Sequence, residues 1–213
     1  MRRSTGVAAM ALCLAALPAT ASADQISGSG AGSVGAVDIA VGQQTAHQDP
    51  LAPCEVDKTA ENRSDPVTVG TTTKFGLGST TCKRNDDGTV SVQVSGQRFE
   101  TTVLKQFGGP VITARTFKSG CNSTANGSNG SMELGTVTGV TVPQNIPANY
   151  VVTIPGANGA PPLAEVVLNE LIVPTPADGS LVTHAMHIKL FPQGGPASGD
   201  ILVGTAVCAP YGG

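Results

Sequence analysis

The sequence predicts an all-β fold: a single domain built as an antiparallel β-sandwich, or a barrel-like sandwich, that disulfide bonds hold together. Three observations predict it. Hydrophobic and polar residues alternate over several short segments, which is the pattern of strands with one buried face. Turn-forming residues separate these segments. Four of the five cysteines lie in the part of the chain that we expect to be exported.

The composition limits the class of protein. The chain has 213 residues, of which 13% are charged and 3% are aromatic, and it contains no Trp. Typical domains have about 25% charged residues. The formal net charge is −3, and the basic residues are scattered rather than clustered as phosphate binding requires. We therefore expect no nucleic-acid partner and a length sufficient for one domain with a core.

Residues 1–23 have the pattern of a cleaved signal peptide. Arg2 and Arg3 form a positive start, Val7–Leu17 is an apolar run, and Ala21–Ala23 is a small-residue cleavage site. The run is shorter than the about 20 residues that a membrane-spanning helix needs. We predict a mature chain that begins at Asp24, is secreted or extracellular, and has no membrane segment.

Cleavage would leave an even number of cysteines: Cys54, Cys82, Cys121 and Cys208. In an exported chain this indicates two disulfide bonds, and four cysteines allow three pairings. Proximity in the sequence favours Cys54–Cys82, which leaves Cys121–Cys208 as the second bond. We expect no zinc site at these cysteines, because no CxxC pair occurs.

The N-terminal part of the mature chain, residues 24–66, is predicted to be flexible or irregular. Residues 24–35 are rich in Gly and Ser, and residues 43–66 are polar with little periodicity. The β domain is predicted to cover residues 67–213, where periodicity of two becomes regular.

Within the β domain, Thr89–Ser95 alternates without interruption, and Asn85–Gly88 before it favours a hairpin turn over a calcium loop. Leu163–Val173 is compatible with a helix, but its β-branched residues favour a strand. Further strands are expected at the other alternating segments, which are residues 98–105, 111–118, 150–154, 182–190 and 201–207.

Two short motifs resemble binding motifs but lack the necessary context. Gly30–Gly35 has the G-x-G-x-x-G spacing, yet no helical pattern follows it. His184 and His187 form an HxxH string, and residues three apart in a strand point to opposite faces. We therefore expect His184 on the apolar stripe with Val182 and Met186, as a core or half-buried histidine, and neither a metal site nor a cofactor.

The sequence gives no assembled catalytic set. It contains no G-x-S-x-G motif, and all four mature cysteines are expected to be oxidised. We therefore predict a non-enzymatic protein without catalytic residues. The alternative is a secreted hydrolase that uses carboxylate and histidine chemistry at Glu165, Glu170 and His187, if the fold brings them together.

Residues 88–208 resemble the choice-of-anchor P family of secreted actinobacterial proteins. The motifs that carry the resemblance are Thr113–Cys121, Ile154–Gly156, Leu168–Glu170, Thr183–Leu190 and Gly199–Ala206. It implies an exported, β-rich protein with a variable C-terminal sorting tail and no established catalytic residues. This chain differs at Leu171, where a glutamine is usual, and ends at Gly213 without an LPxTG-like motif.

These observations together predict a secreted, non-enzymatic interaction or structural module. The expected partner is a cell-wall or other extracellular surface component, held without a covalent anchor. We expect the binding surface at the Asn122–Gly130 tip and the Pro192–Gly199 turn, because loops on a rigid scaffold commonly carry binding sites.

Overall fold

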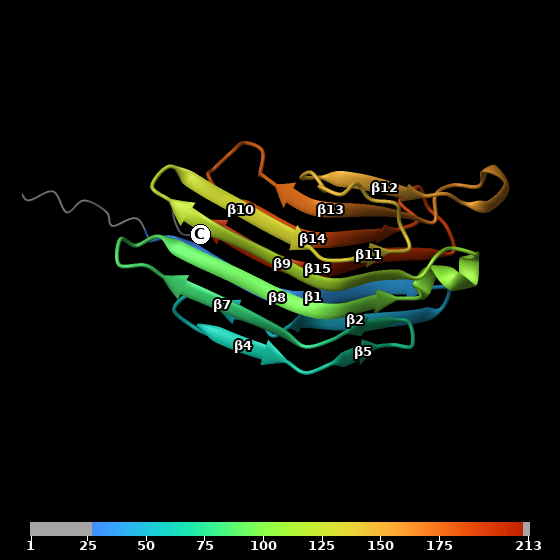
Figure 1. The fold of residues 1–213 in the computed structure, drawn as a ribbon, viewed down its shortest axis with the longest axis horizontal. Helices are drawn as coiled ribbons and strands as arrows, with labels where there is room; N and C mark the ends of the chain where they lie inside the picture. Colours follow the sequence, from blue (N-terminus) through green and yellow to red (C-terminus); the bar gives the residue numbers. More distant parts are fainter. Residues whose placement is uncertain (1–26, 211–213) are drawn as a thin grey trace, which may run out of the picture.

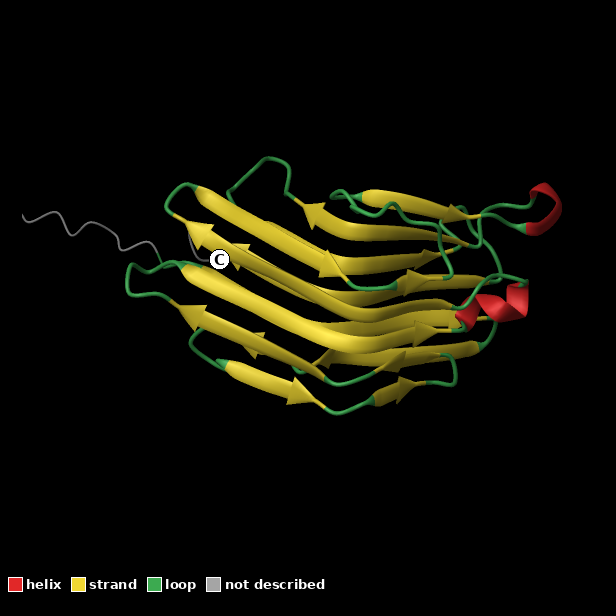
Figure 2. Cartoon of the chain, viewed as in Figure 1, coloured by secondary structure: helices red, strands yellow, loops and turns green. Residues whose placement is uncertain are grey.

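The protein forms two antiparallel sheets that pack as a β-sandwich. The computed structural model describes residues 27–210, and the predicted signal peptide lies outside them. The two layers lie one behind the other in Figure 1, and Figure 2 shows that strands make up nearly all of the regular structure. The all-β sandwich predicted from the sequence is confirmed.

Sheet A has seven strands, with the order β12-β13-β14-β15-β1-β2 and with β3 paired to β1. The strands are β12 (Tyr150–Ile154), β13 (Ala164–Ile172), β14 (Leu181–Leu190), β15 (Ala197–Ala209), β1 (Ser29–Val41), β2 (Gln44–Leu51) and β3 (Cys54–Glu55). The segment Leu163–Val173 is therefore a strand, as its β-branched residues predicted.

Sheet B has eight strands. Its main path is β10-β9-β8-β6-β5, while β7 pairs with β8, β4 with β7, and β11 with β9. The strands are β10 (Gly127–Leu134), β9 (Ile112–Thr124), β8 (Val90–Thr101), β7 (Gly78–Arg84), β4 (Glu61–Ser64), β6 (Thr73–Phe75), β5 (Val67–Val69) and β11 (Val137–Thr138).

Two short 3-10 helices complete the regular structure of the described residues, η1 (Val103–Phe107) and η2 (Ala157–Gly159). No helix in this part of the chain is long and apolar enough to span a bilayer. The Asn85–Gly88 turn is confirmed as the β7–β8 hairpin, where the Asn85 amide donates to the Thr89 carbonyl and Gly88 has a φ of 83°.

The N-terminal segment differs from the expectation of an irregular chain. The described part of residues 24–66 contains β1 to β4, and β1 lies inside sheet A between β15 and β2. Because the N-terminal β1 pairs with the C-terminal β15, no domain boundary separates them. The Gly/Ser composition of β1 therefore reflects packing rather than flexibility.

Inward-facing glycines explain the composition of β1. A Cβ atom on Gly30 or Gly32 would lie 2.8–2.9 Å from Val92 of the opposite sheet, and one on Gly35 would overlap the Phe75 ring. Real Cβ atoms do not approach other atoms so closely, so glycine is required where the two sheets come together here. The G-x-G-x-x-G string is thus part of a core strand.

Two disulfide bonds join the sheets. Cys54 of β3 is bonded to Cys82 of β7, and Cys121 of β9 is bonded to Cys208 of β15. Each bond therefore connects sheet A to sheet B, and the pairing favoured by the sequence is confirmed. Between the sheets, the largest fully buried side chains include Phe75, Phe99 and Phe117.

Candidate functional site

The outer face of sheet B is polar. Its outward side chains form three adjacent cross-strand rows, which we call the polar face. The rows are Arg63, Ser79, Ser95, Lys118 and Glu133; Glu61, Thr81, Gln93, Gly120 and Ser131; and Lys83, Ser91, Asn122 and Asn129. Each row begins with a charged residue on one edge, and hydroxyl and amide groups make up most of the rest, with Lys118 and Glu133 at the far end of the first row.

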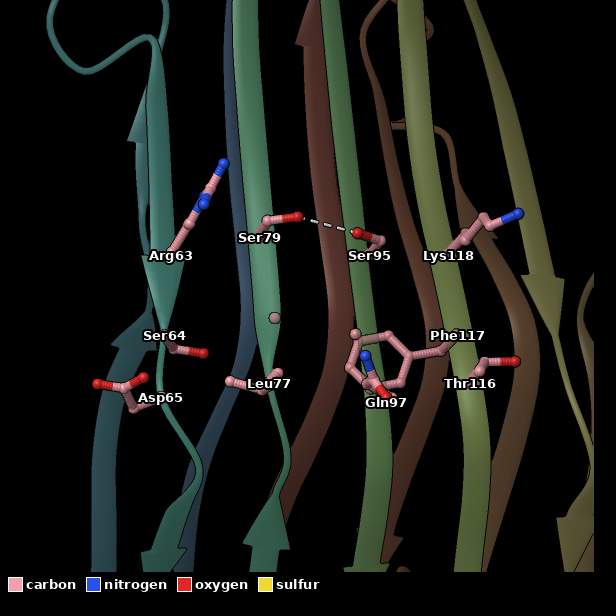
Figure 3. A pocket seen from close by; sticks show the side chains of 12 residues that line it. Arg63, Ser64, Asp65, Leu77, Ser79, Ser95, Gln97, Thr116, Phe117 and Lys118 are labelled. Atoms are coloured by element: carbon pink, nitrogen blue, oxygen red, sulfur yellow. Dashed lines mark hydrogen bonds between the residues drawn. The ribbon is translucent and has the colours of Figure 1, made fainter.

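Two grooves adjoin on the polar face. One has a volume of about 560 Å³ and the other about 490 Å³, and both are lined by Ser79, Ser95 and Lys118. Figure 3 shows the larger groove with Arg63 on one side, Lys118 on the other, and the serine pair between them. The two serine hydroxyl oxygens are 3.0 Å apart. The grooves therefore form one continuous hydrogen-bonding surface.

Two glycines in the larger groove allow core side chains to pack close beneath it. A Cβ on Gly96 would overlap the ring of Phe117, and one on Gly78 would lie 2.5 Å from Val34 of sheet A. The Phe117 ring, which is 1% exposed, consequently packs close beneath the β8 backbone. This packing places the floor of the groove directly over the core, while Arg63, Gln97 and Lys118 are among the longer side chains that line it.

The ion pair at the edge of the polar face is exposed. Lys118 Nζ lies 3.0 Å from Glu133 Oε2, and both side chains are more than 60% exposed. Such a pair contributes less than about 1 kcal/mol to stability. Its charged groups therefore stay accessible to solvent and to a ligand.

The outer face of sheet A has a different pattern, which arises from an interruption of strand pairing. Residues Asn169, Ala185, Gly204 and Val34 lie in one row across four strands, and the cross-strand pairing skips this row. Asn169 and Gly204 have φ values of 52° and 64°. The alternation of inward and outward side chains changes phase at this row.

The phase change brings His184 and His187 onto the same face. On β14, Thr183 points inward, because its hydroxyl lies 2.6 Å from Ser119 of sheet B, and the buried Met186 also faces the core. The intervening Ala185 absorbs the change, so both histidines face outward. The expectation that they point to opposite faces is therefore wrong. His184 is buried, at 6% exposed, but it is not beside Met186 on the core face.

The two histidines belong to a hydrogen-bonded group that we call the His–Glu cluster: Glu170, His184, His187, Asp200 and Thr205. His187 bridges three strands, with Nδ1 2.7 Å from Glu170 Oε2 and Nε2 2.7 Å from Asp200 Oδ1. His184 Nδ1 lies 2.9 Å from the Thr205 hydroxyl, and its Nε2 lies 3.8 Å from Glu170 Oε2. The same carboxylate oxygen therefore contacts His187 at hydrogen-bond distance and lies near the His184 ring without bonding it.

Burial and these contacts shift the pKa values of the cluster. Burial lowers the pKa of His184 to about 4, so this ring is neutral at pH 7. Burial also acts to lower the pKa of His187, but hydrogen bonds with Glu170 and Asp200 outweigh it and raise that pKa. The pKa of Glu170 is lowered, because its contact with His187 and the nearby cations outweigh burial. The His187 cation is therefore favoured between two carboxylates.

The three residues of the hydrolase alternative lie on this same face. Glu170 and His187 are in direct contact, and Lys189 connects Glu165 to Glu170 at 3.5 and 3.6 Å. The polar atoms of the cluster mostly bind one another. A neighbouring apolar groove of about 390 Å³ reaches only Thr205 of the cluster and continues to Ala31 and Val207. Sequence reasoning missed Asp200 and Thr205 because their proximity depends on strand register.

The predicted loop surface is also revised. Most of Asn122–Gly130 lies in β9 and β10, which a tight turn connects. Gly130 packs near Leu181, at the start of β14, whereas the 192–199 turn follows the end of β14 at Leu190. The two segments therefore lie at opposite ends of the sandwich and cannot form one binding surface. In the sequence, the polar residues that alternate with valines in Thr89–Ser95 indicated a polar outer face.

Comparisons with protein-family models, curated proteins and solved structures give no match to this chain. The resemblance to the choice-of-anchor P family stays a prediction.

Proposed function

We propose that this protein is an extracellular interaction module that binds a hydroxyl- and amide-rich polymer of a cell surface through the polar face. The observation that supports this proposal most is the pair of adjoining grooves over Ser79, Ser95 and Lys118. Their hydroxyl and amide groups donate and accept hydrogen bonds without committing the surface to one charge.

The extracellular location is supported by the disulfide bonds. Both bonds cross from one sheet to the other, and such bonds persist in oxidising compartments. The predicted signal peptide and the resemblance to exported proteins agree with this location. The polar face would then retain the protein at the surface by binding its ligand.

The composition of the polar face limits the type of ligand. Its three rows contain no aromatic side chain, so ring stacking does not contribute to recognition. Hydrogen bonds to exposed groups are individually weak after competition with water. A repeating polymer compensates, because one chain can engage many copies of the module or many contacts along the groove. We therefore favour a polysaccharide or peptidoglycan over a small soluble molecule.

Co-sedimentation with purified Gram-positive cell-wall polymers tests the proposal. The oxidised protein should pellet saturably, and pelleting should persist at high salt because uncharged groups dominate the grooves. Ser95→Ile fills the groove and should abolish pelleting. Thr153→Ile, at an exposed position on the outer face of sheet A, adds the same apolar side chain and should not.

Either of two results would overturn the proposal. Wild-type protein that stays entirely in the supernatant would exclude retention by these polymers. Equal loss of pelleting in Ser95→Ile and Thr153→Ile would show that the polar face is not the binding surface.

A further inference from the structure

One edge of sheet A is formed by β12, which pairs with β13 and, in the described residues, has no strand on its other side (Figure 1). The strand runs from Tyr150 to Ile154 in one continuous register and contains no proline and no charged residue. Native proteins usually protect a sheet edge with charges, prolines or bulges, because its unpaired backbone groups can bind another strand. This edge lacks all three.

The other edge strands of the described part carry such protection or are very short. β2 contains Asp49 and Pro50. β4 contains Glu61 and Arg63, and β10 contains Glu133. β3, β5 and β11 have three residues or fewer, which is too short to offer a long row of backbone groups. β12 is therefore the edge strand that remains open to pairing.

The pairing of β12 with β13 shows which backbone groups are free. The Asn149 amide donates to a β13 carbonyl at 2.9 Å. Because hydrogen-bonded positions alternate along antiparallel strands, the backbone groups of every second residue after Asn149 also face β13. The N–H and C=O of Tyr150 and Val152, and the N–H of Ile154, consequently face the open edge. The Ile154 carbonyl accepts from the Leu163 amide.

Exposed apolar side chains gather along the same edge. Among the described residues, four large hydrophobic side chains are exposed, and three of them lie here: Val151 on β12, Ile172 at the end of β13, and Val173 directly after it. The Asn149 side chain exchanges two hydrogen bonds with the Leu171 backbone, which ends the pairing just before Ile172. Grouped exposed apolar residues indicate an interaction surface, whereas single ones are common.

A second copy of β12 fits this edge. Antiparallel pairing about a two-fold axis at Val152 places that residue opposite itself. The neighbouring pairs are Tyr150 with Ile154 and Val151 with Thr153. The edge-facing backbone groups of the two copies then meet in the hydrogen-bonded register, so each copy supplies the donors and acceptors that the other lacks. All opposed side chains are aromatic or β-branched, which pair favourably across strands, and no like charges meet.

We propose that the protein forms a two-fold symmetric dimer in which β12 of each copy pairs with β12 of the other, so that sheet A continues across both chains. The paired segment has five residues, so the interface is small and the dimer is weak and reversible. This pairing is independent of the polymer-binding function of the polar face. Where both occur, the dimer presents two polar faces and binds a repeating polymer with greater avidity than a single chain.

Sedimentation equilibrium of the oxidised protein at micromolar to millimolar concentrations tests the dimer. The dimer fraction should rise reversibly with concentration. Val151→Lys should raise the dimer dissociation constant about tenfold or more, because a charged side chain on an edge strand opposes pairing and both copies carry it. Leu77→Lys is the matched control. Leu77 is also apolar and is 52% exposed, but it precedes β7 of sheet B, so this change should leave the dimer intact.

A cross-link tests the register. Val152→Cys places two thiols at opposed positions whose Cα atoms are about 5.5 Å apart, within the range that a disulfide bond spans. In the same register, Thr153→Cys places the two Cα atoms about 8 Å apart, which is too far. Mild oxidation should therefore give a covalent dimer of Val152→Cys and not of Thr153→Cys. Peptide mapping checks that the two native disulfide bonds are intact.

Circular dichroism checks that each variant is folded, and the exposed Val151 position keeps the test possible if Val152→Cys unfolds. Wild-type protein that stays monomeric at millimolar concentration would overturn the proposal. So would unchanged dimerisation of folded Val151→Lys, an equal loss in Leu77→Lys, or equal cross-linking of the two cysteine variants.

Discussion

The outer faces of the two sheets carry similar cross-strand ionic contacts in different surroundings. On sheet B, Lys118 and Glu133 are 3.0 Å apart and largely exposed, whereas on sheet A the 2.7 Å contact of His187 and Glu170 is largely buried. Side chains on the polar face are therefore available to a ligand, while those of the His–Glu cluster bind one another. The comparison teaches that burial, rather than the contact distance, decides whether a charged group is committed to structure.

The largest expected difference between the faces is in stability. His187→Ala leaves Glu170 buried without its main partner, and breaking a buried pair in this way costs about 3–5 kcal/mol. Lys118→Ala should cost less than about 1 kcal/mol, because its pair is exposed. Urea unfolding of the oxidised proteins measures both. Equal losses would remove the energetic distinction between the faces.

The second expectation concerns the dependence of stability on pH. Burial lowers the folded pKa of His184 to about 4, from the ordinary histidine value of 6.5. A proton therefore binds the unfolded chain first, and this group's contribution to stability is lost as the pH falls from about 6.5 to about 4, by up to about 3 kcal/mol. The raised pKa of His187 acts oppositely, since its contribution is retained in this window and is lost only as the pH rises through its folded pKa.

Urea unfolding at several pH values between 7 and 4 separates these effects. His184→Gln should lose less stability than the wild type over this range. A parallel decline in the free energy of unfolding of the two proteins would show that groups other than His184 cause the loss.

A third prediction concerns the contact between the sheets beneath both faces. Gly35→Ala places a methyl group against the Phe75 ring and near the Leu202 carbonyl, and overpacking of this kind costs about 1–3 kcal/mol. Phe75→Leu in the same chain should recover part of the loss, because the two positions share one space. A double-mutant cycle measures this coupling, and simple additivity of the two changes would contradict the packing described for β1.

The smallest expected effect on stability is on the polar face. Ser95 is exposed, and Ser95→Ile should change the free energy of unfolding by less than about 0.5 kcal/mol. The same variant is expected to lose polymer binding. A large loss of stability would mean that this face contributes to folding, and its binding defect would then not identify a ligand surface.

The sequence predicted the features that depend on local pattern. Alternation identified strands such as β8, β14 and β15, and the cysteine positions predicted both disulfide bonds. It failed at β1, because the core-facing positions there include Gly30, Gly32 and Gly35, which carry no hydrophobic signal although the opposite sheet packs directly on them.

The candidate sites depended on information that a linear pattern lacks. The relation of His184 to His187 changes with one interruption of pairing at Ala185, which four strands share. Likewise, Ser79 and Ser95 come together because β7 and β8 pair in a particular register. Long-range register therefore determined both surfaces, and the period-two pattern alone could not place them.

The most direct test of the functional separation of the two faces is an amide chemical-shift titration of the oxidised protein with soluble cell-wall polysaccharide fragments. We expect the shifts to concentrate in β7, β8 and β9 around Ser79, Ser95 and Lys118, and to leave β13 and β14 unchanged. Shifts centred on Glu170 and His187, or no shifts at saturating fragment concentration, would contradict recognition by the polar face.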